Sequence, residues 1–157
     1  MKITAKILEV SRNDDSLVVM IQLENTTDKE IRFLEWGTPF EQPLESNIFE
    51  IYRGNDKVRY VGIRCKRGEA SDACYSTLPA GSTITIPFVI NDEYDVYSEG
   101  EYKIRLNCYF TTKEEELIKV ESDYFKFSEE LNNLESTLNN YVKELENRNE
   151  DNNQTRD

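Results

Sequence analysis

Hydrophobic and polar residues alternate along most of the first 127 residues, which is the pattern of half-buried β-strands. In the clearest segment, 101–110, Lys103, Arg105 and Asn107 alternate with apolar residues, which are Tyr102, Ile104, Leu106, Cys108 and Phe110. These apolar residues are predicted to face the interior, with Cys108 acting as a small buried hydrophobe. Segment 83–90 keeps the same parity through Ile84, Ile86, Phe88 and Ile90. Its outward Pro87 indicates an edge strand or a bulge.

About eight segments of this kind follow one another, separated by short turns and without a helical pattern between them. The predicted strands are 2–10, 17–23, 31–34, 47–53, 57–63, 83–90, 101–110 and 117–127. Tight polar turns join the first three, which are expected to form a meander. Segment 17–23 is apolar on both parities and is expected to be covered on both faces. The sequence thus predicts an all-β, antiparallel, immunoglobulin-like β-sandwich.

The pattern changes at Ser128, which is predicted to cap a C-terminal α-helix that begins with Glu129 and Glu130. Apolar residues then recur at steps of three and four, at Leu131, Leu134, Leu138, Tyr141 and Leu145. A stripe this short is marginal alone, so it must dock on the sandwich or form a homodimer seam. The predicted organisation is a β-sandwich over 1–127, an amphipathic helix over 128–146 and a disordered polar tail over 147–157.

The formal net charge of −12 argues against nucleic acid and anionic membranes as general partners. Eight acidic and three basic residues give −5 to 128–157, which leaves −7 for the rest. The N-terminus carries no run long and apolar enough for a signal peptide or a membrane span. The sequence therefore predicts a cytoplasmic protein, with a secreted protein whose leader has been removed as the alternative.

The chain contains no His and only three Cys, so few residues are available as catalytic groups or metal ligands. Catalysis and zinc binding that require imidazole are excluded, and scattered Cys do not form a zinc ribbon. No phosphate-binding glycine loop occurs. We expect no enzyme activity, cofactor or metal. The odd Cys count favours reduced thiols, with a Cys65–Cys74 bridge as the alternative in an oxidising compartment.

The stretch 31–75 holds the single Trp, in the loop W-G-T-P-F-E at 36–41. Its large aromatics either close the end of the core or are offered to a partner, since exposed apolar area is costly. Basic residues follow, namely Arg53, Lys57, Arg59, Arg64, Lys66 and Arg67. They either form an anion-binding face or pair with Asp92, Glu93, Asp95 and Glu99. We interpret the acidic cluster itself as a solvated turn rather than a calcium site.

The order of several short motifs resembles the N-terminal, non-catalytic β-sandwich of deuterolysin-type (aspzincin) metalloendopeptidases, including the lysine-specific ones. The resemblance covers roughly residues 11–110. It rests on 36–41 (W-G-T-P-F-E), 49–51 (F-E-I), 58–62 (V-R-Y-V-G), Lys66-Arg67, Tyr75, Leu78, Gly81, Tyr94-Asp95 and 100–104 (G-E-Y-K-I). The family's catalytic domain carries H-E-x-x-H, which a chain without His cannot supply. The resemblance therefore implies only the companion domain, a pro-region that assists folding and restrains the protease.

These observations predict a non-enzymatic, protein-binding module that resembles a metalloprotease pro-domain and acts as a protease inhibitor in trans. The alternative is an intracellular interaction or assembly module that reuses the scaffold without a protease target. In either case the partner is a protein. The candidate partner surface comprises Trp36, Thr38, Pro39, Phe40, Glu41, Arg59, Arg64, Lys66 and Arg67.

Overall fold

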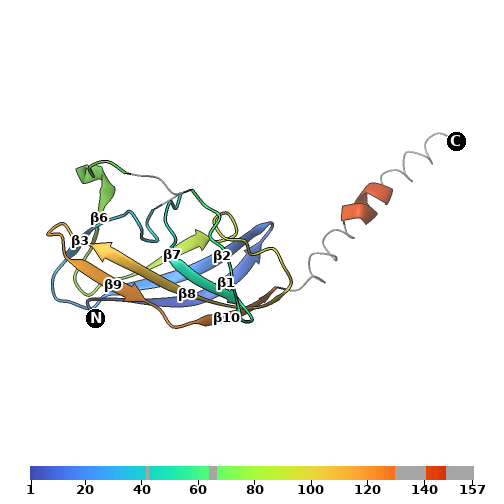
Figure 1. Cartoon of the computed structure of the whole chain (residues 1–157), viewed down its shortest axis with the longest axis horizontal. Coiled ribbons are helices and arrows are strands. Elements are labelled where there is room, and N and C mark those ends of the chain that lie inside the picture. Colours follow the sequence, from blue (N-terminus) through green and yellow to red (C-terminus); the bar gives the residue numbers. More distant parts are fainter. Residues whose placement is uncertain (42, 64–66, 130–140, 148–157) are drawn as a thin grey trace.

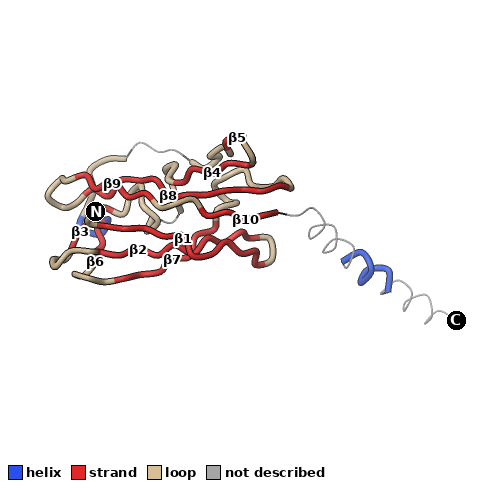
Figure 2. The backbone as a smooth tube through the Cα atoms, turned by 90° about the horizontal axis from the view of Figure 1, so that it is seen from below, coloured by secondary structure: helices blue, strands red, loops and turns tan. Residues whose placement is uncertain are grey.

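The computed structural model describes residues 1–41, 43–63, 67–129 and 141–147. Strands of two layers dominate these residues, and every strand pairing within them is antiparallel (Figures 1 and 2). The predicted all-β, antiparallel class is therefore confirmed. The described residues form ten strands instead of about eight. The difference arises because segment 117–127 is divided into two strands and a further strand begins at Tyr75.

One layer has the strand order β1-β2-β7. Its strands are β1 (Ile3–Asn13), β2 (Ser16–Asn25) and β7 (Thr83–Val89). The inner face of β2 is buried, whereas its other face is half-buried, so the predicted cover of both faces is only partly correct. Pro87 is exposed on the edge strand β7, as predicted. The predicted parity of β7 is correct, because Ile84 lies opposite buried Leu23 on the inner face, but near the start of the strand its side chain is still 37% exposed.

The second layer is built around β8 (Gly100–Thr111), the longest strand. On one side lie β4 (Phe49–Arg53) and β5 (Asp56–Lys57), and on the other β10 (Phe125–Glu129) and β9 (Leu117–Glu121). Figure 2 shows β4, β5, β8 and β9 above the layer of β1, β2 and β7. All five apolar residues that the alternation assigns to the interior of β8 are buried. Burial raises the pKa of the Cys108 thiol to about 12.

Two further strands, β3 (Ile31–Leu34) and β6 (Tyr75–Leu78), pair separately with each other. A short 3₁₀ helix, η1 (Asp72–Cys74), directly precedes β6 in the chain. The predicted meander is therefore wrong, because β3 pairs with β6 and not with β2. Asn25 explains the change of direction. Its buried amide donates hydrogen bonds to the carbonyls of Lys29 at 2.8 Å and Leu78 at 3.0 Å, which fixes the turn after β2 against β6.

The hairpin after β4 is shorter than predicted. The sequence predicts that segment 57–63 pairs with β4, but β5 contains only Asp56 and Lys57. The chain then leaves β4 and meets the segment before β8, through a bridge between Tyr60 and Tyr94. The Val61 amide donates to the Glu93 carbonyl at 2.8 Å. Competition from this second backbone partner ends the hairpin early.

Residues 128 and 129 belong to β10, so the prediction that Ser128 caps a helix is wrong. Residues 141–147 are helical and exposed throughout, including Tyr141 at 60% and Leu145 at 41%. These two members of the predicted stripe therefore do not pack against the sheets. Leu131, Leu134 and Leu138 lie outside the described residues, as does Cys65, while Cys74 and Cys108 carry free thiols.

Candidate functional site

The loop after β3 carries the predicted residues 36–41, and its own hydrogen bonds fix its shape. Gly37 adopts a φ of +71°, a conformation that favours glycine. The amide and the hydroxyl of Thr38 both donate to the Glu35 carbonyl, at 3.1 and 2.6 Å. Thr38 then accepts from the amides of Phe40 at 3.2 Å and Glu41 at 3.1 Å. Thr38 and Pro39 are buried, so they support the loop from within.

Glu41 is the charged centre of this loop and is only 6% exposed. Its carboxylate accepts a hydrogen bond from the Glu45 amide at 3.0 Å and another from the Arg67 guanidinium. The same Arg67 group lies 2.6 Å from the Glu45 carboxylate. Since a buried carboxylate is costly unless it is paired, Arg67 is a structural requirement of the loop.

The two aromatic residues of the loop are half-buried. The Phe40 ring lies 4.9 Å from Phe33, which in turn lies 4.8 Å from Phe110 at the end of β8. Trp36 lies under the Arg67 guanidinium, which is 4.6 Å from the ring centroid. Phe40 thus extends the core, whereas Trp36 and Arg67 form the outward side of the loop. We call this outward side the Trp36–Arg67 platform.

The far end of the loop is anchored by Tyr94, which is 1% exposed. Its hydroxyl accepts hydrogen bonds from the amides of Ile48 at 3.0 Å and Phe49 at 2.9 Å, and donates to Asn47 at 2.7 Å. Burial raises the pKa of this phenol, so it stays a neutral donor at physiological pH. These bonds fix the point at which the loop enters β4.

The other basic residues of the stretch 53–67 are placed differently. Arg59 is exposed, and its carbonyl accepts from the Asp95 amide at 3.1 Å. Arg53 donates to the backbone carbonyl of Glu99 at 2.7 Å. Among the described basic residues, none forms an ion pair with the carboxylates of 92, 93, 95 or 99. Arg64 and Lys66 lie outside the described residues.

Gly62, the last residue of the V-R-Y-V-G motif, leaves room for a partly buried carboxylate. A Cβ atom at this position would lie 2.1 Å from Glu93 Oε2 and 2.6 Å from the Tyr60 hydroxyl. Burial, followed by repulsion from Asp92, raises the pKa of Glu93. The glycine therefore has a packing reason in this structure.

A second group of polar residues lies on the outer face of β4 and β8, beyond the predicted surface. Glu50 accepts hydrogen bonds from Asn107 and Arg105, each at 2.7 Å, and from Tyr124 at 3.1 Å. These bonds, the one from Asn107 foremost, hold the pKa of Glu50 below its ordinary value. Arg105 is thereby neutralised within the face.

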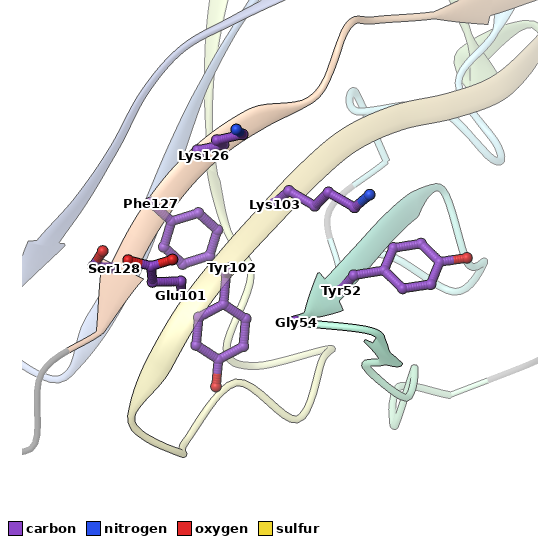
Figure 3. Close-up of a pocket in the computed structure, with 8 residues that line it drawn as sticks. All are labelled: Tyr52, Gly54, Glu101, Tyr102, Lys103, Lys126, Phe127 and Ser128. Atoms are coloured by element: carbon purple, nitrogen blue, oxygen red, sulfur yellow. The ribbon is translucent and has the colours of Figure 1, made fainter.

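Beside this network, a row of outward residues crosses three strands. Tyr52 of β4 is paired with Lys103 of β8, and Lys103 with Lys126 of β10. They border a depression of about 350 Å³ at the start of β8 (Figure 3). The alternation correctly assigns Lys103 to the outer face. The sequence does not identify its neighbours, because strand order joins residues more than twenty positions apart.

Comparison with known proteins relates the chain to part of a protease. No protein-family model matches it. It is 32% identical over 101 residues to a protein named extracellular protease from Aeromonas hydrophila. The match covers 64% of this chain but only 29% of that protease, so the chain spans under a third of its relative. A structure solved as a Northeast Structural Genomics Consortium target matches with a TM-score of 0.38 and 13% identity over 81% of this chain and 83% of the other.

Two properties of the described residues bear on the class of site. Within the described ranges, no group of three or more Cys, Asp or Glu side chains is arranged to hold a metal ion. In the same part of the chain, no helix is long and apolar enough to cross a membrane.

Proposed function

We propose that this chain is a non-enzymatic module that binds a protease and restrains it in trans, as a metalloprotease pro-region does. The observation that carries the proposal is the 32% identity to less than a third of an extracellular protease. The order of motifs supports the deuterolysin-type pro-region as the finer assignment. The absence of His from the chain supports a role without zinc-dependent catalysis.

The Trp36–Arg67 platform is the proposed contact surface. Large aromatics and arginines supply most of the energy in protein interfaces, and Trp36 presents its ring beneath the Arg67 guanidinium. The buried residues Thr38 and Glu41 hold this surface in place. The partner would therefore meet a preformed surface and lose little conformational entropy on binding.

The test uses the related extracellular protease as the probe. Purified chain is titrated into the protease, while cleavage of a peptide substrate and heat of binding are recorded. We expect saturable binding with loss of cleavage, and a Trp36→Ala variant that binds at least 10-fold more weakly. Tyr109→Ala, which removes a 53% exposed ring on the outer face of β8, is the matched control.

Three results would contradict the proposal. The first is an absence of both binding and inhibition, which would favour an intracellular assembly module. The second is hydrolysis by the chain alone that survives purification and chelators. The third is equal weakening by Trp36→Ala and Tyr109→Ala, which would exclude the Trp36–Arg67 platform. A protease partner also implies an encounter outside the cell, whereas the assembly alternative implies the cytoplasm.

A further inference from the structure

We propose that the outward row of Tyr52, Lys103 and Lys126 is a recognition site for an acidic segment of a protein partner. We call this row the lysine row. It depends on the proposed function only in that the partner is a protein. The inference goes beyond that function, because it concerns another surface and another ligand chemistry.

The lysine row lies far from the Trp36–Arg67 platform. Lys103 is near the start of β8, whereas Phe33, which supports the platform loop, forms a bridge with Thr112 just beyond the end of β8. At the rise of an antiparallel strand, these two points on β8 are about 30 Å apart. Variants at one surface can therefore be read independently of the other.

The register places two positive charges side by side. Lys103 and Lys126 are directly opposite on neighbouring strands, an arrangement of like charges that destabilises a sheet. Within the described part of the chain, neither side chain forms an ion pair with a carboxylate. This is unexpected in a protein with 31 acidic and 19 basic residues.

The neighbouring row shows that the same face can neutralise a cation. There Arg105 lies directly opposite Glu50 and makes an ion pair of 2.6 Å with it. The charge of Arg105 is thus paired within the face, whereas the charges of Lys103 and Lys126 in the neighbouring row are not. Positions at which a local rule is broken without compensation are often functional.

Aromatic rings hold the first lysine in place. Lys103 Nζ lies 5.2 Å from the centroid of Tyr52 and 4.6 Å from that of Tyr124. These cation–π contacts orient the ammonium group without cancelling its charge. Figure 3 shows Tyr52, Lys103 and Lys126 at the same depression, together with Glu101, which is the single acid among its lining residues. A ligand could place a carboxylate at the lysines and an apolar side chain along the Tyr52 ring.

The charges of the site and of the whole protein favour a short acidic segment of a protein as the ligand of the lysine row. A protein of net charge −12 repels polyanions such as nucleic acid or an anionic bilayer at long range. A short acidic segment of a protein brings only a few carboxylates, which matches a site of two lysines. Binding of this kind is weakened by salt.

The test uses a labelled peptide of alternating Glu and Phe residues, with Gln–Phe and Lys–Phe peptides for comparison. Fluorescence anisotropy at low and physiological salt measures affinity for the full chain. We expect saturable binding of the Glu peptide alone, weakened at least 10-fold by the double change Lys103→Gln and Lys126→Gln. The matched control is Lys113→Gln with Lys119→Gln, which removes two lysines that pair with Asp72 and Glu121. The control should change affinity by less than twofold.

Several outcomes would overturn the proposal. Absence of saturable binding of the Glu peptide would do so, as would equal weakening by the two double variants. Preferential binding of phosphatidylserine vesicles or single-stranded DNA through Lys103 and Lys126 would assign the row to another class of ligand. Self-association that depends on the two lysines, without peptide binding, would assign it to a second copy. Thermal melting serves as a folding check. The Lys103→Gln and Lys126→Gln variant should melt no lower than the parent, because it removes a like-charge pair.

Discussion

Two basic regions of this molecule use positive charge in opposite ways. At the Trp36–Arg67 platform, Arg67 contacts both Glu41 and Glu45 and covers an aromatic ring. On the outer face of the second layer, Lys103 and Lys126 are directly opposite on neighbouring strands, and within the described residues neither has a carboxylate partner. Arg67 stands in a basic stretch of the sequence but is neutralised by two carboxylates in the structure. Lys103 and Lys126 are 23 positions apart in the sequence, and strand pairing brings their positive charges together.

This difference shows why the position of a basic residue in the sequence does not by itself predict whether its charge is paired. The partner of Arg67 is Glu41, 26 positions earlier in the chain. Lys126 meets Lys103 only because β10 pairs with β8. Which charges remain open to a partner is decided by strand order, and experiments that perturb the two regions should therefore give different results.

The largest effect is expected for Glu41→Ala. This change removes a buried hydrogen-bond acceptor and leaves Arg67 without its main partner, which should cost about 3 kcal/mol of unfolding free energy. Urea denaturation measures it. The control Glu45→Ala, at a side chain 26% exposed, should cost about 1 kcal/mol. Equal losses for the two variants would show that Glu41 is not the centre of the loop.

Phe40→Ala should give the next largest effect. The ring is half-buried against Phe33, so its truncation should cost about 2 kcal/mol, less than for a fully buried Phe. Thermal or urea unfolding measures this loss, with Tyr109→Ala as the exposed-ring control. If stability is unchanged while protease binding falls, Phe40 is an exposed anchor. It would then belong to the contact surface and not to the core that supports the loop.

Glu50→Gln tests the neutralised row beside the lysines. Hydrogen bonds from Asn107, then Arg105 and Tyr124, lower the pKa of Glu50, so its stabilising effect is present at neutral pH. That effect is lost as the pH falls through the folded-state pKa. The variant should be less stable by about 1 kcal/mol at pH 7, with the difference shrinking under acid. Urea denaturation across pH measures it, with exposed Glu114→Gln as the control. A difference independent of pH would contradict the assignment.

Ending the chain after Glu129 should have the smallest effect on the sheets. Because Tyr141, Val142 and Leu145 are exposed, we expect a change within about 0.5 kcal/mol, measured by thermal melting. If the predicted leucine stripe docked on the sandwich, the truncation would instead lower the melting temperature by more than this. Sedimentation of both chains tests the alternative of a homodimer seam. The truncation removes seven acidic and three basic residues, a net charge of −4. Comparing the affinity of the full and truncated chains for the Glu peptide therefore also shows whether this negative charge weakens binding at the lysine row.

The alternation of apolar residues was sufficient to predict the all-β class and the buried side of β8. These features depend on which side chains leave water, and strand periodicity reports that directly. The same local signal could not predict that β3 pairs with β6, or that β5 ends at Lys57. Those outcomes depend on buried polar groups, Asn25 and Tyr94 among them, whose hydrogen-bond partners are distant in sequence.

For the candidate sites, the sequence by itself determined that no His is available for catalysis and that a Trp-containing loop stands near a basic stretch. Tertiary structure decided that Thr38, Pro39 and Glu41 support that loop from within, and that Arg67 is held by two carboxylates. It also brought Tyr52, Lys103 and Lys126 into one row. The physical reason is that burial and ion pairing depend on distances in space, which a sequence specifies only through the completed strand order.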